Sequence, residues 1–291
     1  MQKEREGEIL MVMLSILESL FPIFSLFSIA LIGAIYSYAF VVVIATVILV
    51  TILITKKGWK TLFIPEAQKD LLLTSFFITM LFLLLFISLR YTTAGNVAVL
   101  IFLQLLFSYL YFNIFGSEKL TPLHMLGAFV MGAGAIIMLF PEDLQFNLGD
   151  GMALAAAAIA PIANLYQKRA RAHVGSITIL TYRNLVALPV LFLMALLFEP
   201  LPEQEKLIDA LPYLLANGIL VYVIAKIFWI EALHRISITK MSAMIALIPL
   251  FTLITAYFIL NEVPMMQQLL GIVPILIGGY LITRPASAVS P

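Results

Sequence analysis

The sequence predicts an all-α integral membrane protein with ten transmembrane helices in two inverted five-helix repeats, and three observations support this class. Hydrophobic residues make up 63% of the 291 residues and charged residues only 11%, whereas soluble domains have about 45–50% and about 25%. Apolar runs of membrane-spanning length recur along the chain, and the sequence matches itself after a shift of 144 residues. A soluble core could not bury this much apolar surface, so lipid must solvate much of it.

The predicted helices are apolar runs between charged or turn-rich clusters, because a helix needs about 20 apolar residues to cross the hydrocarbon core. The charged N-terminus, Met1–Glu8, leads into the first run without a small-residue cleavage site. We therefore expect a first spanning helix and not a removable signal peptide. The ten runs are 9–29, 34–54, 71–89, 94–115, 122–140, 151–167, 176–198, 211–231, 239–260 and 265–283.

The distribution of lysine and arginine predicts the orientation, because cytoplasmic loops carry an excess of both. With the N-terminus inside, thirteen of the seventeen fall in inside segments, and only Arg90 and Lys206 fall outside. The last two, Arg183 and Lys226, lie within spans. The outside connections are acidic instead: Glu142, Asp143, Asp150, Glu199, Glu203, Glu205 and Asp209. We expect a multi-pass protein of the inner (cytoplasmic) membrane with both termini in the cytoplasm.

An internal repeat organises the chain into residues 1–145 and 146–291. The shift aligns about 50 residues from Leu89 with those from Leu233 without a gap. The glutamate and glycine matches weigh most, because both residue types are scarce here: Glu118/Glu262, Gly127/Gly271 and Gly134/Gly278. A repeat of five helices is odd, so the second copy enters the membrane from the opposite side. Inverted repeats are typical of secondary transporters, whose substrate binds near the midplane.

Two repeat-bearing segments carry a family pattern, RYTTAGNVAVLIFLQLLFSYLYFNIFGSEKLTPLHMLGAFVMGAGAII and ALHRISITKMSAMIALIPLFTLITAYFILNEVPMMQQLLGIVPILIGGYLI. The pattern is a small residue at a helix start, a mid-helix proline, a glutamate at the helix end and a glycine-bearing helix. The second copy has Ser242, Pro249, Glu262 and Gly271, whereas the first has Leu105 in place of the proline. On these motifs the whole chain resembles the EamA-like family of the drug/metabolite transporter superfamily. The resemblance implies export or exchange of amino acids, other metabolites or drugs.

Charged residues within spans are candidates for function, because their burial in lipid is costly. Glu18 lies near the middle of the first run, on the same helix face as Ser15 and Pro22. Its carboxylate could bind a substrate amine or carry a proton. The alternative is a protonated or hydrogen-bonded structural acid.

The two cationic residues within spans have equally open roles. Lys226 shares a predicted helix face with Tyr222 and Trp229, which would suit a carboxylate or a ring. Alternatively, Lys226 extends to the cytoplasmic interface. Arg183 is interpreted first as an interfacial or structurally paired residue and second as a substrate contact. An ion pair of Glu18 with Lys226 or with Arg183 is possible.

Neutral polar residues within spans face protein or water and not lipid. Gln104 near the middle of the fourth run is the strongest candidate for a cavity, against interhelical hydrogen bonding. Asn96 begins that helix, and Asn164 follows Pro161 in the sixth run. Pro249 predicts a kink in the ninth helix next to the cavity.

Other repeated residues are interpreted as structural. Glu118 and Glu262 precede Pro122 and Pro264, which suit first helical turns, so we expect each glutamate to serve the helix that follows it. Glycines in the fifth and tenth runs predict close helix contact: Gly127, Gly132, Gly134, Gly271, Gly278 and Gly279.

Several classes of function are disfavoured by what the sequence lacks. It has no cysteine, no GxSxG, no Walker loop and no metal-spaced acid cluster, and its net charge of +1 gives no field for nucleic acid. We therefore expect no enzyme, no cofactor and no nucleic-acid partner, with proton coupling left open. The expected partners are a small-molecule substrate and the lipid bilayer, with the protein as a monomer or homodimer.

These features together predict a secondary transporter, an exporter or exchanger of small metabolites that works by alternating access. The predicted substrate-binding residues are Glu18, Gln104, Asn164, Arg183, Tyr222, Lys226 and Trp229. A lipid-linked or nucleotide-sugar translocator is the first alternative, although only two cations within spans could meet its phosphates. A membrane-embedded enzyme or sensor is the second.

Overall fold

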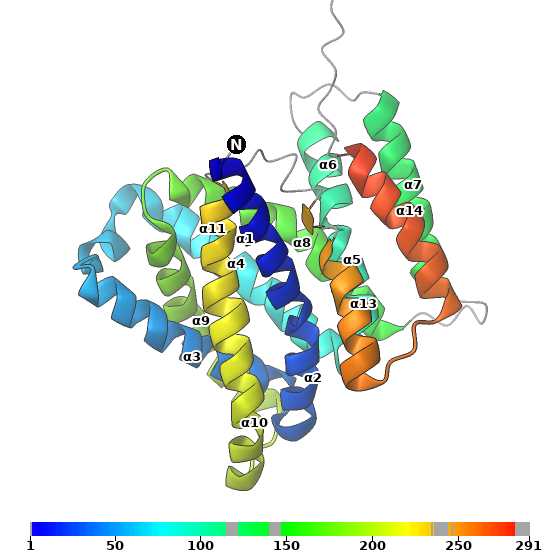
Figure 1. The fold of residues 1–291 in the computed structure, drawn as a ribbon. Helices are drawn as coiled ribbons and strands as arrows, with labels where there is room; N and C mark the ends of the chain where they lie inside the picture. Colours follow the sequence, from blue (N-terminus) through cyan, green and yellow to red (C-terminus); the bar gives the residue numbers. More distant parts are fainter. Residues whose placement is uncertain are drawn as a thin grey trace, which may run out of the picture.

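The computed structural model describes residues 2–114, 122–139, 147–233, 235, 244–245 and 247–282. These residues form a bundle of helices without any strand (Figure 1). Seven segments are long and apolar enough to cross a membrane, and three shorter apolar helices accompany them. Each of the ten predicted runs overlaps one of these segments, so the class of multi-pass helical membrane protein is confirmed.

The helices of the first half are α1 (Gln2–Ser19), α2 (Phe21–Ile32), α3 (Ala34–Thr55), the short η1 (Trp59–Phe63), α4 (Pro65–Ser88), α5 (Ala94–Phe102), α6 (Gln104–Ile114) and α7 (Pro122–Leu139). Those of the second half are α8 (Leu148–Arg171), α9 (Ser176–Phe198), α10 (Gln204–Ala216), the π-helix η2 (Asn217–Ala225), α11 (Lys226–Leu233), α13 (Leu247–Leu260) and α14 (Met266–Ile282).

Within the described residues, three predicted spans are interrupted helices. The first breaks at Leu20 between α1 and α2, with Pro22 in the first turn of α2. The fourth breaks at Leu103 between α5 and α6, although Leu105 and not proline stands nearby. The eighth passes through η2. Broken helices at membrane depth are tolerated where protein surrounds them or where they line a cavity.

Helices of the two halves pack against each other in a reciprocal pattern. The pairs include α3 with α9, α5 with α13 and α7 with α14, together with α1 with α11 and α4 with α8. By the 144-residue shift, α1 corresponds to α8, α3 to α9, α4 to the span that ends with α11, the span of α5 and α6 to that of α13, and α7 to α14. Exchanging corresponding spans leaves the first three pairs unchanged and converts the α1–α11 pair into the α8–α4 pair. The packing is therefore the same after the exchange, as a pseudo-two-fold relation requires.

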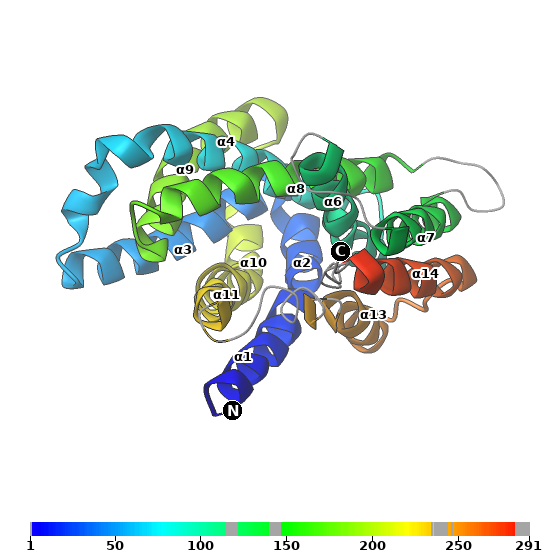
Figure 2. The same cartoon turned by 90° about the horizontal axis from the view of Figure 1, so that it is seen from above.

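Small residues hold α7 against α14, and Figures 1 and 2 both show these two helices side by side. A Cβ atom added to Gly278 would lie 2.5 Å from the Gly127 carbonyl oxygen, and one added to Gly134 would lie 2.7 Å from that of Gly271. The prediction of close contact is confirmed for these repeat-matched glycines. It is wrong for Gly132, which has no neighbouring atom within 4 Å of an added Cβ.

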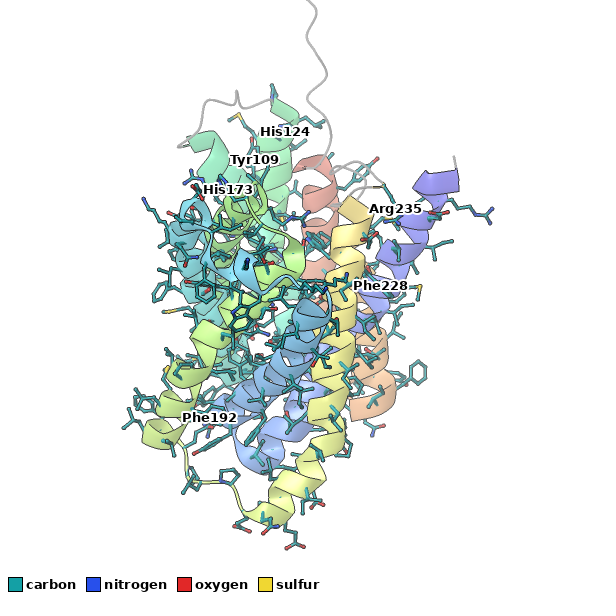
Figure 3. All side chains as sticks on the ribbon, turned by 90° about the vertical axis from the view of Figure 1, so that its left-hand side faces the viewer. Tyr109, His124, His173, Phe192, Phe228 and Arg235 are labelled. Atoms are coloured by element: carbon teal, nitrogen blue, oxygen red, sulfur yellow. The ribbon has the colours of Figure 1, made fainter. Side chains whose placement is uncertain are left out.

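The bundle has two ends, which we call the N-terminal end and the opposite end. The N-terminal end holds the start of α1, and the opposite end holds the starts of α3, α5, α8 and α10 (Figure 1). Figure 3 places His124, His173 and Arg235 toward the N-terminal end and Phe192 toward the opposite end.

Candidate functional site

A cavity of about 330 Å³ lies between helices of both halves, and we call it the central cavity. Its wall is mainly apolar and aromatic, with a few polar side chains, which is typical of small-molecule sites. Its aromatic residues are Phe21, Phe82 and Trp229. Its polar residues are Glu18, Gln104, Ser108, Asn164, Gln167, Arg183, Lys226 and Thr252.

The structure brings six of the seven predicted site residues to this wall: Glu18, Gln104, Asn164, Arg183, Lys226 and Trp229. Tyr222 is buried behind it, where its ring lies 6.4 Å from that of Phe21 and 5.0 Å from that of Phe82. Tyr222 lies in the π-helix η2, four residues before Lys226. Both side chains lie near the Phe82 ring, but of the two only Lys226 lines the cavity.

An ion pair crosses from the first half to the second within the cavity. The Lys226 ammonium donates a hydrogen bond to Glu18 Oε1 at 2.5 Å, and the two side chains are 22% and 17% exposed. Lys226 Nζ also lies 5.8 Å from the centre of the Phe82 ring. Lys226 therefore reaches into the protein and not toward the interface, and Glu18 pairs with Lys226 and not with Arg183.

Both members of this pair lie where a helix changes. Glu18 is in the last turn of α1, just before the break at Leu20, and Lys226 is the first residue of α11 after η2. Ser15, one turn before Glu18, donates its hydroxyl hydrogen to the Met11 carbonyl at 2.8 Å. π-Helical turns and breaks of this kind are frequent at functional sites.

Gln104 also lies at a helix change, because it is the first residue of α6 after the break at Leu103. Asn164 lies on α8 after Pro161, which is buried within the helix. Pro249 is buried in the first described turn of α13, between the cavity-lining residues Ile248 and Thr252.

Arg183 lies in the second turn of α9 and is only 4% exposed. Its Nε has no hydrogen-bond partner, and no ion pair among the described residues includes it. Tyr38, Tyr222 and Glu18 are near enough to interact with it electrostatically. Within the described part of the chain, the structure thus gives Arg183 neither an interfacial position nor a structural ion pair.

A buried polar network ties three helices together at the opposite end. Asn96 Nδ2 on α5 donates to both carboxylate oxygens of Asp150 on α8, at 3.1 and 3.2 Å. The Thr92 hydroxyl donates to the same carboxylate. Gln268 Nε2 on α14 donates to Asn96 Oδ1 at 2.6 Å and to Thr93 Oγ1 at 3.2 Å. The next residues of α5, Val97 and Ala98, line the cavity, so this network lies beside the cavity at that end.

Glu199 makes a second buried contact at the opposite end. Its carboxylate accepts hydrogen bonds from the backbone N–H groups of Ala34, Ile35 and Tyr36 at 2.8 to 3.0 Å. It therefore caps α3, whose preceding residue Gly33 has no side chain to do so. Arg90 lies 3.5 Å from the carboxylate and is half-exposed. Glu199 and Asp150, both predicted for the outside connections, are buried, with exposed fractions of 8% and 5%.

Glu262 has a structural role, but not for the helix that follows it. Its Oε1 accepts a hydrogen bond from the Ala94 N–H at the start of α5, at 3.4 Å. The start of α14 is served instead by Gln268, whose side-chain oxygen accepts from the Met265 N–H at 2.8 Å. Glu118 and Ser242 lie outside the described residues.

At the N-terminal end, the described ion pairs are partly exposed, unlike the buried hydrogen bonds at the opposite end. Arg235 interacts with Glu231 at 2.5 Å and with Glu6 of α1 at 3.7 Å, and these side chains are 30% to 52% exposed. The hydrogen bond from Arg235 to Glu231 raises the pKa of the guanidinium above its usual value. Among the described residues, no group of three or more acidic or histidine side chains is arranged to hold a metal ion.

A helical membrane protein with a central cavity between its helices, mainly apolar but with a few polar and charged side chains, has the architecture of a membrane transporter. The comparison with known families agrees with this class. The model of the EamA-like transporter family matches residues 5–140 and again residues 147–284. The chain therefore belongs to the EamA-like transporter family, as the resemblance in its sequence predicted.

Similar proteins carry transporter names. An uncharacterized transporter from Archaeoglobus fulgidus is 27% identical over 216 residues, which cover 71% of this chain and 72% of that protein. The uncharacterized transporter YoaV from Bacillus subtilis is 23% identical, covering 67% and 68%. A solved crystal structure with 17% identity covers 96% of each chain with a TM-score of 0.68, so the two share a fold.

Proposed function

We propose that this protein is a secondary transporter that moves a small metabolite, such as an amino acid or a related compound, through the central cavity. One observation carries the proposal. Helices of both halves meet at a cavity whose wall holds the Glu18–Lys226 ion pair. Intramembrane charges are costly and typically mark substrate or ion pathways. Substrate binding is proposed for the six predicted residues of the wall, and Tyr222 supports the rings of Phe21 and Phe82.

We propose further that all ten apolar segments cross the membrane and that the halves are inverted. The reciprocal helix pairs support this arrangement. The asymmetry of lysine and arginine supports placing both termini in the cytoplasm, with the protein in the inner membrane. A single cysteine added at Lys57 or at Lys206 tests this, since the chain has no cysteine of its own. Labelling of Lys57→Cys from outside intact cells would refute the orientation.

Alternating access gives the two ends of the bundle distinct roles. The network around Asp150 is buried at the opposite end, which this orientation makes the outer end. Cavity residues on α8, such as Asn164 and Gln167, lie in its half toward the N-terminal end. We infer a state closed to the outside and loaded from the cytoplasm, which favours export or exchange. Coupling to protons through Glu18 is part of this proposal.

Transport in proteoliposomes tests the proposal. Purified protein is reconstituted and assayed for uptake and counterflow of labelled amino acids and related metabolites, with and without a pH gradient. Lys226→Met should abolish transport, because it removes a charge from the cavity and leaves the Glu18 carboxylate without its ion-pair partner. Lys206→Met is the matched control, since that lysine is half-exposed and, among the described residues, pairs with Glu203 alone. If no compound of a broad panel moves, transport of this class is refuted.

The same experiment separates the alternatives. Counterflow that requires a nucleotide or a lipid-linked phosphate would favour a translocator of that kind. The described wall argues against such a translocator, because Lys226 is already paired and Arg183 is the one other described cation of the wall that could bind several phosphate charges. Chemical conversion of a compound by the reconstituted protein would favour an enzyme instead.

A further inference from the structure

Arg183 is the one charged residue of the described cavity wall that takes part in no described ion pair. Glu18 and Lys226 form a neutral pair at 2.5 Å, so they cancel each other. The other polar groups of the wall are amides and hydroxyls. Tyr38 and Tyr222, the remaining groups near Arg183, are phenols that are neutral at physiological pH. The described wall therefore carries a net charge of about +1 on a side chain that is 4% exposed.

An arginine cannot relieve this situation by losing its proton, because the guanidinium group stays protonated in proteins. A buried charge without a partner is strongly unfavourable unless an ion of opposite charge or water meets it. Arg183 Nε is buried and lacks a hydrogen-bond partner. Its guanidinium also offers a planar fork of donors, which matches the two oxygens of a carboxylate.

The rest of the cavity wall indicates which other chemical groups such an anion has. The rings of Phe21, Phe82 and Trp229 face a space of about 330 Å³, which fits a small apolar or aromatic body. A free ammonium group on the substrate would have no unpaired carboxylate to bind, because the wall's one described carboxylate already accepts a hydrogen bond from Lys226. A second acidic group on the substrate would find no second unpaired cation on the described wall.

We propose that Arg183 is the anion subsite of the central cavity and that the transported substrate is a small organic monoanion, a carboxylate with an apolar or aromatic body. This proposal rests on the proposed transport function and narrows its substrate class. The ion pair then serves as a neutral wall element, and Arg183 supplies the charge that selects the ligand.

Three compounds of related shape test the charge preference. 3-Phenylpropionate carries only a carboxylate, 2-phenylethylamine carries only an ammonium group, and phenylalanine carries both. Binding to the purified full-length protein is measured by calorimetry and by thermal stabilisation, since a ligand that binds the native state stabilises it. We expect the order 3-phenylpropionate, then phenylalanine, then 2-phenylethylamine. Tighter binding of the amine than of the carboxylate would overturn the proposal.

Substitutions then assign the preference to Arg183. Arg183→Gln should weaken 3-phenylpropionate binding about tenfold or more, because a charge-assisted hydrogen bond to the ligand is lost, and should leave amine binding unchanged or stronger. Arg183→Lys should retain part of the affinity, because it keeps the charge without the fork. Arg169→Gln is the control, since Arg169 is exposed outside the cavity on α8. Equal carboxylate affinity in all four proteins would refute the assignment.

The thermal stability of the empty variants separates a binding role from a purely structural one. If Arg183 binds the substrate, Arg183→Gln without ligand should unfold at the same or a higher temperature, because a buried unpaired charge is removed. A structural arginine would instead make this variant less stable and weaken all three compounds equally. Carboxylate binding without transport would refute the transport function, whereas transport of amines alone would refute only this subsite.

Discussion

Gly278 offers a quantitative test of the helix pairing that joins the two halves. A Cβ atom added there would lie 2.5 Å from the Gly127 carbonyl oxygen and 2.5 Å from the Met131 backbone nitrogen, both on α7. Backbone atoms of a neighbouring helix cannot rotate away as a side chain can. Gly278→Ala therefore forces α14 away from α7, and Gly132→Ala is the matched control, because its Cβ would meet nothing within 4 Å.

The expected magnitude follows from these distances. Ordinary van der Waals contact begins at 3.4 Å, so the helices must separate by roughly 1 Å at this point, and overpacking of this kind typically costs about 1–3 kcal/mol. Replacing a helical glycine by alanine gains about 0.8–1.0 kcal/mol in either variant. Gly132→Ala should therefore be more stable than the wild-type protein, and Gly278→Ala should be less stable than Gly132→Ala by about 1–3 kcal/mol.

Unfolding of the purified protein in detergent, followed by the loss of helical circular dichroism with denaturant or heat, measures the difference. Gly134→Ala serves as a second probe of the same contact, since its Cβ would lie 2.7 Å from the Gly271 carbonyl oxygen. If Gly278→Ala and Gly132→Ala are equally stable, the close approach of α14 to α7 is not as the structure has it.

Three further predictions address the site and its closed end. Glu199→Ala should lower the unfolding temperature, because it leaves the first N–H groups of α3 without an acceptor. Glu199→Gln should lower it less, because its amide oxygen still accepts, and equal losses in the two variants would refute the cap. Glu18→Gln should remove substrate binding or the pH dependence of transport, and a variant that transports with the wild-type pH dependence would exclude this role. Asp150→Ala should increase labelling of a cysteine at Val97 from the opposite end, and unchanged labelling would show that the network does not close the cavity.

The positions of the helices could be predicted because the membrane imposes one length and one polarity on them. The seventh predicted run, 176–198, matches α9 (Ser176–Phe198) residue for residue. The breaks could not be predicted. α5 ends at Phe102 without a proline, and η2 replaces α-helical geometry around Tyr222 within a continuous apolar run, so hydropathy marks neither change.

The cavity residues were predictable for a related reason. A polar side chain within a span must face protein or water, so intramembrane polarity alone indicated Glu18 and Gln104. The burial of Glu199 and Asp150 at the opposite end was not predicted, because the sequence around an acidic residue next to a span does not show whether its carboxylate contacts water or another helix. One signal could have found Glu199: α3 begins after Gly33, which has no side chain to satisfy the first N–H groups.

The unequal ends of the bundle bear on how the proposed cycle could run. Opening the opposite end must separate Asp150 and Gln268 from Asn96, but water then replaces their hydrogen bonds. The net cost is therefore about 0.5–1.5 kcal/mol for each bond and not the 4–6 kcal/mol of a bond in an apolar medium. A ligand can change this balance only by its difference in affinity between the two states. Arg183 lies on α9, outside the network that joins α5, α8 and α14, so a carboxylate bound there favours opening only if the wall around Arg183 changes when the network parts.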